Sequence, residues 1–302
     1  MDLESTGLSL GDAKEIYFKD VAAMIVIEDK IILADRKSST IVVYKDDFEV
    51  ASEMHFASKQ VGFFWGITDM SVLKDAVFGV LVPGFLRKSE CWFYELQSDD
   101  TVKYLRTIAL NKRCYGICFQ RDFLFATFSP AYGSPGYVRM LDLQGKSLKK
   151  FMHDKNKKQL FSNRISKIYV DSKFRIFVCD DKKRELLILK KDEFDDSISY
   201  VTSHKYSVLT IAIKRDGTSF LSTDSDDGVV LLHQNGKWIF NNFLSAAKLS
   251  GKPSAVAYTE NGETSKLIVV IKSKYWFRSH TKLVCYYLCQ TKDTEARILM
   301  ED

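Results

Sequence analysis

One unit of short apolar runs and turns recurs six times along the chain, and this repeat constrains the fold more than any other feature. Three copies are clear: MIVIEDKIILADRKSSTIVVYKDDFEV at 24–50, KIYVDSKFRIFVCDDKKRELLILKKDEF at 167–194 and LTIAIKRDGTSFLSTDSDDGVVLLHQNG at 209–236. In each, a second strand ends in Ala-Asp, Cys-Asp or Thr-Asp before a polar turn and a third strand. The second strands of all six copies end near residues 35, 82, 128, 180, 224 and 271, a spacing of about 44–52 residues that is typical of propeller blades.

The repeat predicts an all-β fold, a six-bladed β-propeller whose blades are four-stranded and antiparallel, in a single domain over 1–302. The expected blades lie near 21–57, 66–110, 114–152, 164–203, 207–247 and 253–290. Since an open ring exposes two sheet edges, we expect an N-terminal strand, residues 15–18, to complete the sixth blade, with residues 297–300 as the rival. A helix is expected only around 241–251.

Two of the repeats carry a family resemblance. Residues 169–189 (YVDSKFRIFVCDDKKRELLIL) and 32–44 (ILADRKSSTIVVY) resemble the NHL repeat of the C-terminal propellers of tripartite-motif (TRIM-NHL) proteins. That family runs from an Asp-Gly turn through a strand ending in Val-Ala-Asp, whereas here only Asp216-Gly217 keeps the Asp-Gly turn. The RING and B-box domains of those proteins are absent from this sequence. The resemblance implies RNA or protein partners and gives no basis for ligase activity.

Composition and cysteine spacing indicate a cytoplasmic protein. The 302 residues are 46% hydrophobic and 27% charged, no window approaches 18 consecutive apolar residues, and MDLESTGLSLGDAKE lacks the features of a secretion signal. Cys114 and Cys118, like Cys285 and Cys289, are four residues apart within expected strands. At about 3.3 Å per residue, each pair is too far apart for a disulfide. We therefore expect buried, reduced thiols and no contact with a membrane.

Motifs of catalysis and cofactor binding are missing from the sequence. It has no Gly-x-Ser-x-Gly elbow, His-Glu-x-x-His pair or glycine-rich phosphate loop, and its five histidines are scattered over the blades. The run Asp224-Ser-Asp-Asp-Gly228 resembles the start of a calcium loop, but the glycine comes one position early and the twelfth residue is Asn235 rather than Glu. It is interpreted as an acidic tight turn. No catalytic residue, metal ligand or cofactor is predicted.

Sorting the charged turns by topology predicts two opposite faces. In an antiparallel blade the turns between the second and third strands lie on the same face as the connections between blades. These segments are rich in lysine and arginine, whereas the remaining turns, such as YKDDFE and KKDEFDDS, are acidic. Cations attract acidic partners and nucleic-acid phosphates. The candidate binding residues on this basic face are Arg36, Lys37, Arg87, Lys88, Arg113, Lys182, Lys183 and Arg184.

The stretch KSKYWFRSHTK, residues 272–282, adds aromatic residues to that face. It is expected to form a long second-to-third turn of blade six, where Tyr275 and Trp276 beside Arg278 can stack on an exposed base or on a partner's side chain. The alternative is that Tyr275 and Phe277 continue the strand and pack between sheets.

The sequence as a whole predicts a non-enzymatic binding platform whose basic face contacts RNA or an acidic protein. Single-stranded or hairpin RNA suits loops that present cations and aromatics. The alternative is a calcium-dependent six-bladed hydrolase of the lactonase or esterase kind, with a metal in the central channel, because strand ends of different blades can bring carboxylates together without a local motif. The sequence leaves the oligomeric state open.

Overall fold

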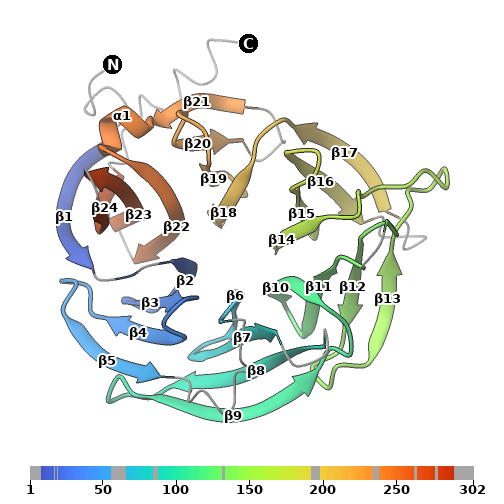
Figure 1. The fold of residues 1–302 in the computed structure, drawn as a ribbon, viewed down its shortest axis with the longest axis horizontal. Helices are drawn as coiled ribbons and strands as arrows, with labels where there is room; N and C mark the ends of the chain where they lie inside the picture. The colour runs from blue at the N-terminus through green and yellow to red at the C-terminus, as the bar shows by residue number, and fades with distance from the viewer. Residues whose placement is uncertain are drawn as a thin grey trace. The chain divides into compact units, whose positions relative to one another are not determined.

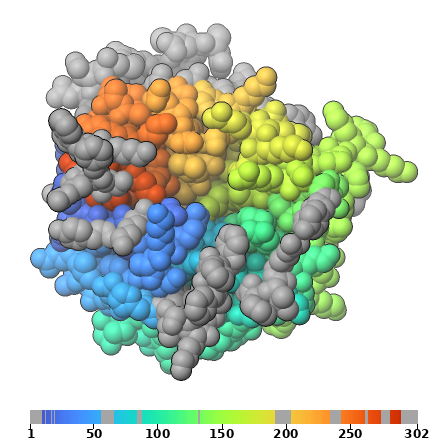
Figure 2. Space-filling model, viewed as in Figure 1, coloured from blue at the N-terminus to red at the C-terminus, as the bar shows by residue number. Residues whose placement is uncertain are grey.

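The computed structural model consists almost entirely of β-strands, grouped in six sheets of four antiparallel strands each, the fold of a six-bladed β-propeller (Figure 1). The residues that the structure describes are 8–16, 18, 20–55, 66–83, 88–130, 133–191, 198–233, 238–261, 264–275 and 278–288; the others are grey in Figures 1 and 2. The chain divides into two compact units, Lys19–Val208 and Met1–Phe18 with Leu209–Asp302. Over the described residues, no helix is long and apolar enough to cross a membrane.

The unit Lys19–Val208 holds blades one to four, each a meander in which consecutive strands pair. Blade one has β2 (Val21–Ile27), β3 (Lys30–Asp35), β4 (Thr40–Tyr44) and β5 (Val50–His55). Blade two has β6 (Asp69–Lys74), β7 (Val77–Pro83), β8 (Ser89–Leu96) and β9 (Val102–Ala109). Blade three has β10 (Cys114–Gln120), β11 (Phe123–Phe128), β12 (Tyr137–Leu141) and β13 (Ser147–Phe151). Blade four has β14 (Ile165–Val170), β15 (Arg175–Asp180), β16 (Glu185–Lys191) and β17 (Ile198–His204). Within this unit the first strands of consecutive blades lie side by side.

The second unit holds blades five and six. Blade five has β18 (Val208–Ile213), β19 (Ser219–Thr223), β20 (Val229–Leu232) and β21 (Trp238–Leu244). Blade six has β22 (Lys252–Asn261), β23 (Thr264–Tyr275) and β24 (Arg278–Leu288). Its fourth strand is β1 (Leu8–Ile16), which pairs antiparallel with β24 from Leu8↔Leu288 to Ile16↔Thr281. The short helix α1 (Ala246–Leu249) begins at Ser245, whose side chain accepts from Lys248 N.

Middle strands of the blades are buried on both faces, because each sheet packs against its neighbours. All six residues of β15 and all five of β4 are buried. Phe78, Phe125 and Phe177 are completely buried on the second strands of blades two, three and four. Outer strands contact protein on fewer sides, and β9 is largely exposed, with Tyr104 at 52%. This explains why the middle strands are continuous apolar runs without alternation.

The aspartate that marks the repeat has a structural role. Asp35 Oδ1 accepts from Asp20 N and Lys37 N, and Asp35 Oδ2 accepts from the Ser38 hydroxyl. Asp180 Oδ2 accepts from Ser162 N, and Asp180 Oδ1 accepts from the Ser162 hydroxyl and from Lys183 N. Each carboxylate therefore joins the segment before its blade's first strand to the turn after its second strand, and both aspartates are only 1% exposed. In blades one and four the aspartate is therefore needed as an acceptor for backbone N–H groups.

Several expectations can now be compared with these elements. The N-terminal strand does complete blade six, but it spans Leu8–Ile16 rather than 15–18, and residues 297–300 lie outside the described residues. The expected helix around 241–251 is present only as the four residues of α1, because β21 continues to Leu244. The stretch 272–282 is not a long turn, since β23 and β24 stay paired as far as Tyr275↔Arg278. This favours the alternative in which Tyr275 continues the strand.

Candidate functional site

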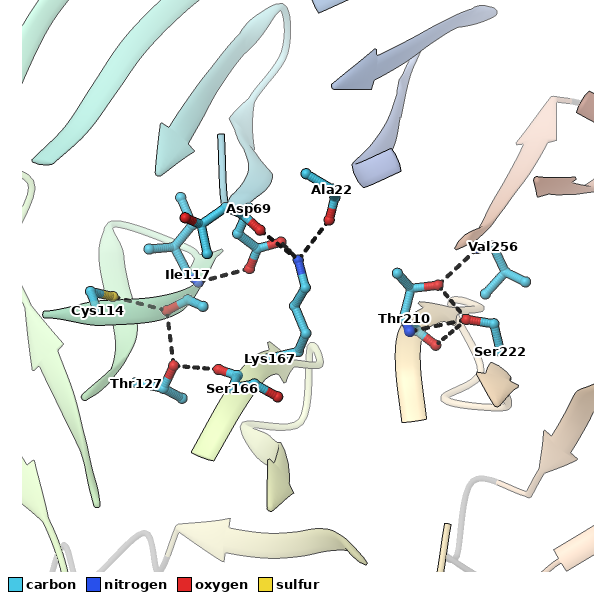
Figure 3. Close-up of polar contacts among 12 residues, drawn as sticks. Ala22, Asp69, Cys114, Ile117, Thr127, Ser166, Lys167, Thr210, Ser222 and Val256 are labelled. Atoms are coloured by element: carbon cyan, nitrogen blue, oxygen red, sulfur yellow. Dashed lines mark hydrogen bonds and ion pairs between the residues drawn. The ribbon is translucent and has the colours of Figure 1, made fainter. Parts of the chain in front are cut away.

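The first strands of three blades meet at one lysine, Lys167 on β14 (Figure 3). Its ammonium nitrogen donates to the carbonyl oxygens of Ala22 at 2.9 Å and Thr68 at 3.0 Å. It also lies 2.5 Å from Oδ1 of Asp69. Lys167 thus extends from blade four to β2 of blade one and to the beginning of β6 in blade two. We call Lys167, its three acceptors and Ile117 the Lys167 centre.

Close packing of β10 against β14 fixes the position of this lysine. A Cβ atom on Gly116 of β10 would lie 2.5 Å from the carbonyl oxygen of Ser166 and 2.9 Å from the Cα of Lys167. Only glycine therefore allows the two strands to approach so closely. The hydroxyl of Thr127 on β11 donates to Ser166 O, which fixes the strand one residue before Lys167. The lysine side chain is 11% exposed.

Asp69 links two blades and also faces the ammonium. Its Oδ2 accepts from the backbone N–H of Ile117 on β10 at 3.0 Å, while Oδ1 faces Lys167. Its side chain is 6% exposed. Burial raises the pKa of Asp69 above the ordinary value of 3.8, although the Lys167 charge and the Ile117 N–H favour the ionised form. The site therefore combines a fixed positive charge with a carboxyl group that holds its proton more tightly than usual.

A calcium ion does not fit the Lys167 centre. A carboxylate and backbone carbonyls are the oxygen ligands that such ions prefer. Here, however, these oxygens surround an ammonium group, and a lysine has three N–H donors, each of which has an acceptor. The part of the chain that the structure describes also contains no group of three or more His, Cys, Asp or Glu residues placed to hold a metal ion.

A second polar cluster lies in the other unit, on the first two strands of blade five and the first strand of blade six (Figure 3). The hydroxyl of Thr210 on β18 accepts from the backbone N–H of Val256 on β22 at 2.8 Å and lies 2.7 Å from the hydroxyl of Ser222. It joins blades five and six as Asp69 joins blades two and three. It contains no charged group, and its contacts account for it as a structural link.

Most residues predicted for the basic face are exposed where the structure describes them. The exposed ones are Arg36, Lys37, Lys88, Lys182, Lys183 and Arg184. Arg36 forms an ion pair with Asp20 at 3.3 Å. Arg113 is half-buried, with its guanidinium carbon 5.0 Å from the centre of the Tyr115 ring. A hairpin at 153–159 projects from the surface, yellow-green in Figure 2, and carries further lysines.

The remaining members of that predicted surface are less well placed. Arg87 and Trp276 lie outside the described residues, and Tyr275 and Arg278 are opposite each other at the end of β23 and β24. That these residues contact RNA or an acidic protein stays a prediction.

The acidic run at 224–228 is a turn between β19 and β20, as interpreted from the sequence. Thr223 N donates to Gly228 O, and Gly228 has a φ of 71°, which glycine adopts without strain. The carboxylate of Asp224 lies 3.8 Å from the Lys252 ammonium. The side chains of this run thus act locally, within the turn and its surroundings.

Sequence reasoning missed both charged members of the Lys167 centre. A signal was present, because Lys167 in ISKIYV and Asp69 in ITDM are charged residues at the first strands of blades, where most neighbouring positions are apolar. Charges at such positions are rarely buried without a partner. The pairing itself, between blades two and four, is not readable from spacing.

The comparisons with known proteins show the fold. A luciferin-regenerating enzyme has a TM-score of 0.58 at 10% identity, over 90% of this chain and 94% of its own. A candidate gluconolactonase has a TM-score of 0.60 at 10% identity, over 90% of this chain and 91% of its own. A protein of unknown function from Bacteroides caccae has a TM-score of 0.56 at 12% identity, over 80% of this chain and 82% of its own. No protein-family model and no curated protein matches the sequence.

These neighbours correct two expectations. The prediction of a non-enzymatic protein is wrong in the light of solved structures that share the fold and are named as enzymes. The resemblance to NHL propellers holds for the six-bladed fold, and the comparisons give no support for a relation to that family. The repeat pattern misled us because it reports how blades are built, which is common to propellers of unrelated function.

Proposed function

We propose that the protein is a hydrolase of small ester or lactone substrates and that its active site is the Lys167 centre. One observation carries the proposal: a buried ammonium and a buried carboxyl group with a raised pKa lie together where three blades meet. The enzymes among the structural neighbours, one of them a candidate gluconolactonase, support this class of reaction.

Lys167 would stabilise the negative charge that develops on a carbonyl oxygen during attack by water. Its ammonium is held by three oxygens from blades one and two, so it would not need to reorganise during the reaction. A fixed charge of this kind in a site shielded from water is the largest contribution in many enzymes. A substrate oxygen that replaces one of the two backbone carbonyls around the ammonium would also lie next to Asp69.

Asp69 would accept a proton from the attacking water and return it to the alkoxy oxygen as the bond between that oxygen and the carbonyl carbon breaks. A carboxyl group is a better base when its pKa is raised towards the working pH, and burial acts in this direction here. Its Oδ2 is fixed by Ile117 N, so the carboxyl plane is oriented by the next blade. Both polar groups come from this chain, and neither role requires a metal ion.

Hydrolysis assays with matched variants test the proposal. Purified protein is given a γ-lactone, a δ-lactone and 4-nitrophenyl acetate, and kcat/KM is compared for wild type, Asp69→Asn and Lys167→Met. We expect kcat/KM to fall about 100-fold or more in both variants, which is the effect of removing one oxyanion-stabilising group from an enzyme. Lys173→Met removes an exposed lysine from the same blade and is expected to keep full activity. Circular dichroism checks that each variant is folded.

A chelator distinguishes this mechanism from the calcium-dependent one. We expect activity and melting temperature to be unchanged by EDTA or added calcium. Activity that depends on calcium, or activity retained by folded Lys167→Met, would contradict the proposed role of Lys167.

A further inference from the structure

Three cations gather around the ring of Tyr137 in blade three. The ammonium of Lys150 lies 4.3 Å from the ring centre, the guanidinium carbon of Arg139 lies at 5.4 Å, and the ammonium of Lys112 lies at 5.8 Å. The ring itself is stacked on Phe128, with centres 5.2 Å apart. Tyr137, Arg139, Lys150 and Lys112 form what we call the Tyr137 cluster. It belongs to blade three and the connection before it, and shares no residue with the Lys167 centre.

Strand register forces the cations of this cluster together. Arg139 on β12 is directly opposite Lys150 on β13, and like charges in this arrangement destabilise a sheet. Lys112 comes from the connection between β9 and β10. Burial, the Arg139 charge and the Lys112 charge all lower the pKa of Lys150. Among the described residues, no carboxylate forms an ion pair with Lys112, Arg139 or Lys150.

Two hydrogen-bond donors in the cluster lack an acceptor. The hydroxyl of Tyr137 and Nε of Arg139 are buried, and neither has a hydrogen-bond partner among the described residues. Tyr137 as a whole is 3% exposed. Buried polar atoms are nearly always paired, so two orphans in contact with the same group of cations require an explanation. An acceptor that carries negative charge would satisfy both the donors and the cations.

We propose that the Tyr137 cluster binds a phosphate group. A phosphate carries more than one negative charge and several acceptor oxygens, which suits three cations and two unpaired donors better than a single carboxylate does. Lys112 and Lys150 are exposed, so an anion reaches them directly from solvent. Contact with the covered Tyr137 hydroxyl requires the Lys150 or Lys112 side chain to move, which long lysine side chains do without a change of the backbone. The site is independent of the proposed hydrolase activity.

Calorimetry and thermal unfolding with inorganic phosphate test this site. Both are measured at constant ionic strength, with sodium chloride replacing phosphate in the control, because general screening also relieves repulsion. We expect phosphate, and not chloride, to raise the melting temperature of the wild-type protein. Lys150→Gln and Lys112→Gln are each expected to weaken phosphate binding about tenfold, the loss of one charge-assisted contact. Lys146→Gln, an exposed lysine at the other end of the same hairpin, is expected to bind as wild type does.

Two further results separate a binding site from an incidental cluster. Without phosphate, Lys150→Gln is expected to melt at a higher temperature than wild type, because the substitution removes the repulsion from Arg139. Its melting temperature is expected to rise less than that of wild type when phosphate is added. Tyr137→Phe removes only the unpaired hydroxyl, and we expect it to keep the wild-type melting temperature and lose phosphate affinity. The proposal is overturned if chloride stabilises as much as phosphate, or if Lys150→Gln and Lys146→Gln bind phosphate equally.

The same experiment identifies the source of the phosphate. Glycerol 3-phosphate is compared with inorganic phosphate. Tighter binding of the ester shows that the site takes a phosphate carried by a larger molecule, and tighter binding of the free ion shows that it takes the ion itself. Either result supports the site. If neither compound binds, the proposal is overturned.

Discussion

The ammonium of Lys167 lies 2.5 Å from Oδ1 of Asp69, a residue 98 positions earlier in the chain. The pair joins blade four to blade two. Lys167 also donates to Ala22 O in blade one and to Thr68 O in blade two. A buried ion pair of this kind costs desolvation energy, so it is seldom a large net source of stability. Removing only one of the two charges is strongly destabilising, because the remaining charge stays buried without a partner.

Lys167→Met is therefore expected to lower the free energy of unfolding by about 3–5 kcal/mol. The substitution keeps the length of the side chain and leaves the Asp69 carboxylate without its cation. In the double variant with Asp69→Asn, no unpaired charge remains and the amide oxygen can still accept from Ile117 N, so part of the loss should be recovered. Urea unfolding of both variants and of wild type measures this. A double variant no more stable than Lys167→Met would show that the charge on Asp69 is not the cause.

The raised pKa of Asp69 gives its contribution to stability a pH dependence of known sign. The folded protein holds this proton more tightly than the unfolded chain, whose carboxyl titrates near 3.8. The contribution of the Asp69 proton to the free energy of unfolding is fully present below pH 3.8. It is lost as the pH rises through the higher pKa of the folded state. We expect the difference in unfolding free energy between wild type and Asp69→Asn to fall with rising pH. A difference that grows with pH would mean that the Lys167 charge outweighs burial.

The sequence predicts the fold well because blade construction is local. Each blade is a meander of consecutive strands, so the order of apolar runs and turns is repeated in the chain itself. The repeated aspartate is also visible, since Asp35 and Asp180 each accept from backbone groups within the same blade. Its role as a junction between the blade's entry and its turn becomes evident only from the coordinates.

The candidate site is much less predictable, because it depends on contacts between blades. Lys167 and Asp69 belong to different repeats, and which first-strand residues meet depends on the stagger of strands such as β10 and β14 at Gly116. The stretch 272–282 shows the converse error. Its unbroken aromatic run suggested a turn, whereas the pairing of Ile271↔Lys282 through Tyr275↔Arg278 extends the β23–β24 ribbon. Local periodicity does not reveal how far two strands stay paired.

Asp180→Ala is expected to destabilise the protein by about 3 kcal/mol or more, since a buried donor left without its acceptor costs about 1–3 kcal/mol. Asp180 accepts from Ser162 N at 2.8 Å, from the Ser162 hydroxyl at 2.5 Å and from Lys183 N at 3.1 Å. Asp224 holds the same place in the repeat of blade five, but its side chain is 58% exposed. Asp224→Ala is the matched control and should change stability by no more than about 0.5 kcal/mol. Equal effects in urea unfolding would refute the junction role of Asp180.

Thr210→Val removes the hydroxyl that links blades five and six without changing the size of the side chain. The Val256 N–H, bonded to Thr210 Oγ1 at 2.8 Å, is then left buried and unpaired. We expect a loss of about 1–3 kcal/mol in unfolding free energy. Thr210→Ser keeps the hydroxyl and loses one methyl group, so it should cost about 0.8 kcal/mol. If valine is tolerated as well as serine, the hydroxyl is not the link.

The cysteines are expected to be unreactive in the native protein. Of the six in the sequence, Cys91, Cys114, Cys118, Cys179 and Cys285 are buried thiols outside any disulfide, which confirms the sequence-based expectation for these five; Cys289 lies outside the described residues. Burial raises the pKa of the Cys118 thiol to about 12, and the pKa values of Cys91, Cys114 and Cys179 are raised for the same reason. Little thiolate, the reactive form, is then present at pH 8.

A thiol-reactive dye measures this in a Cys289→Ser variant, which leaves only those five thiols. We expect no reaction in buffer on the timescale in which all five react in guanidinium chloride, because each thiol must first be exposed by unfolding. One thiol that reacts within minutes under native conditions would show that its strand opens locally or that its burial is incomplete. The rate with native protein should also be independent of dye concentration at high dye, since opening of the fold and not the chemistry then limits the reaction.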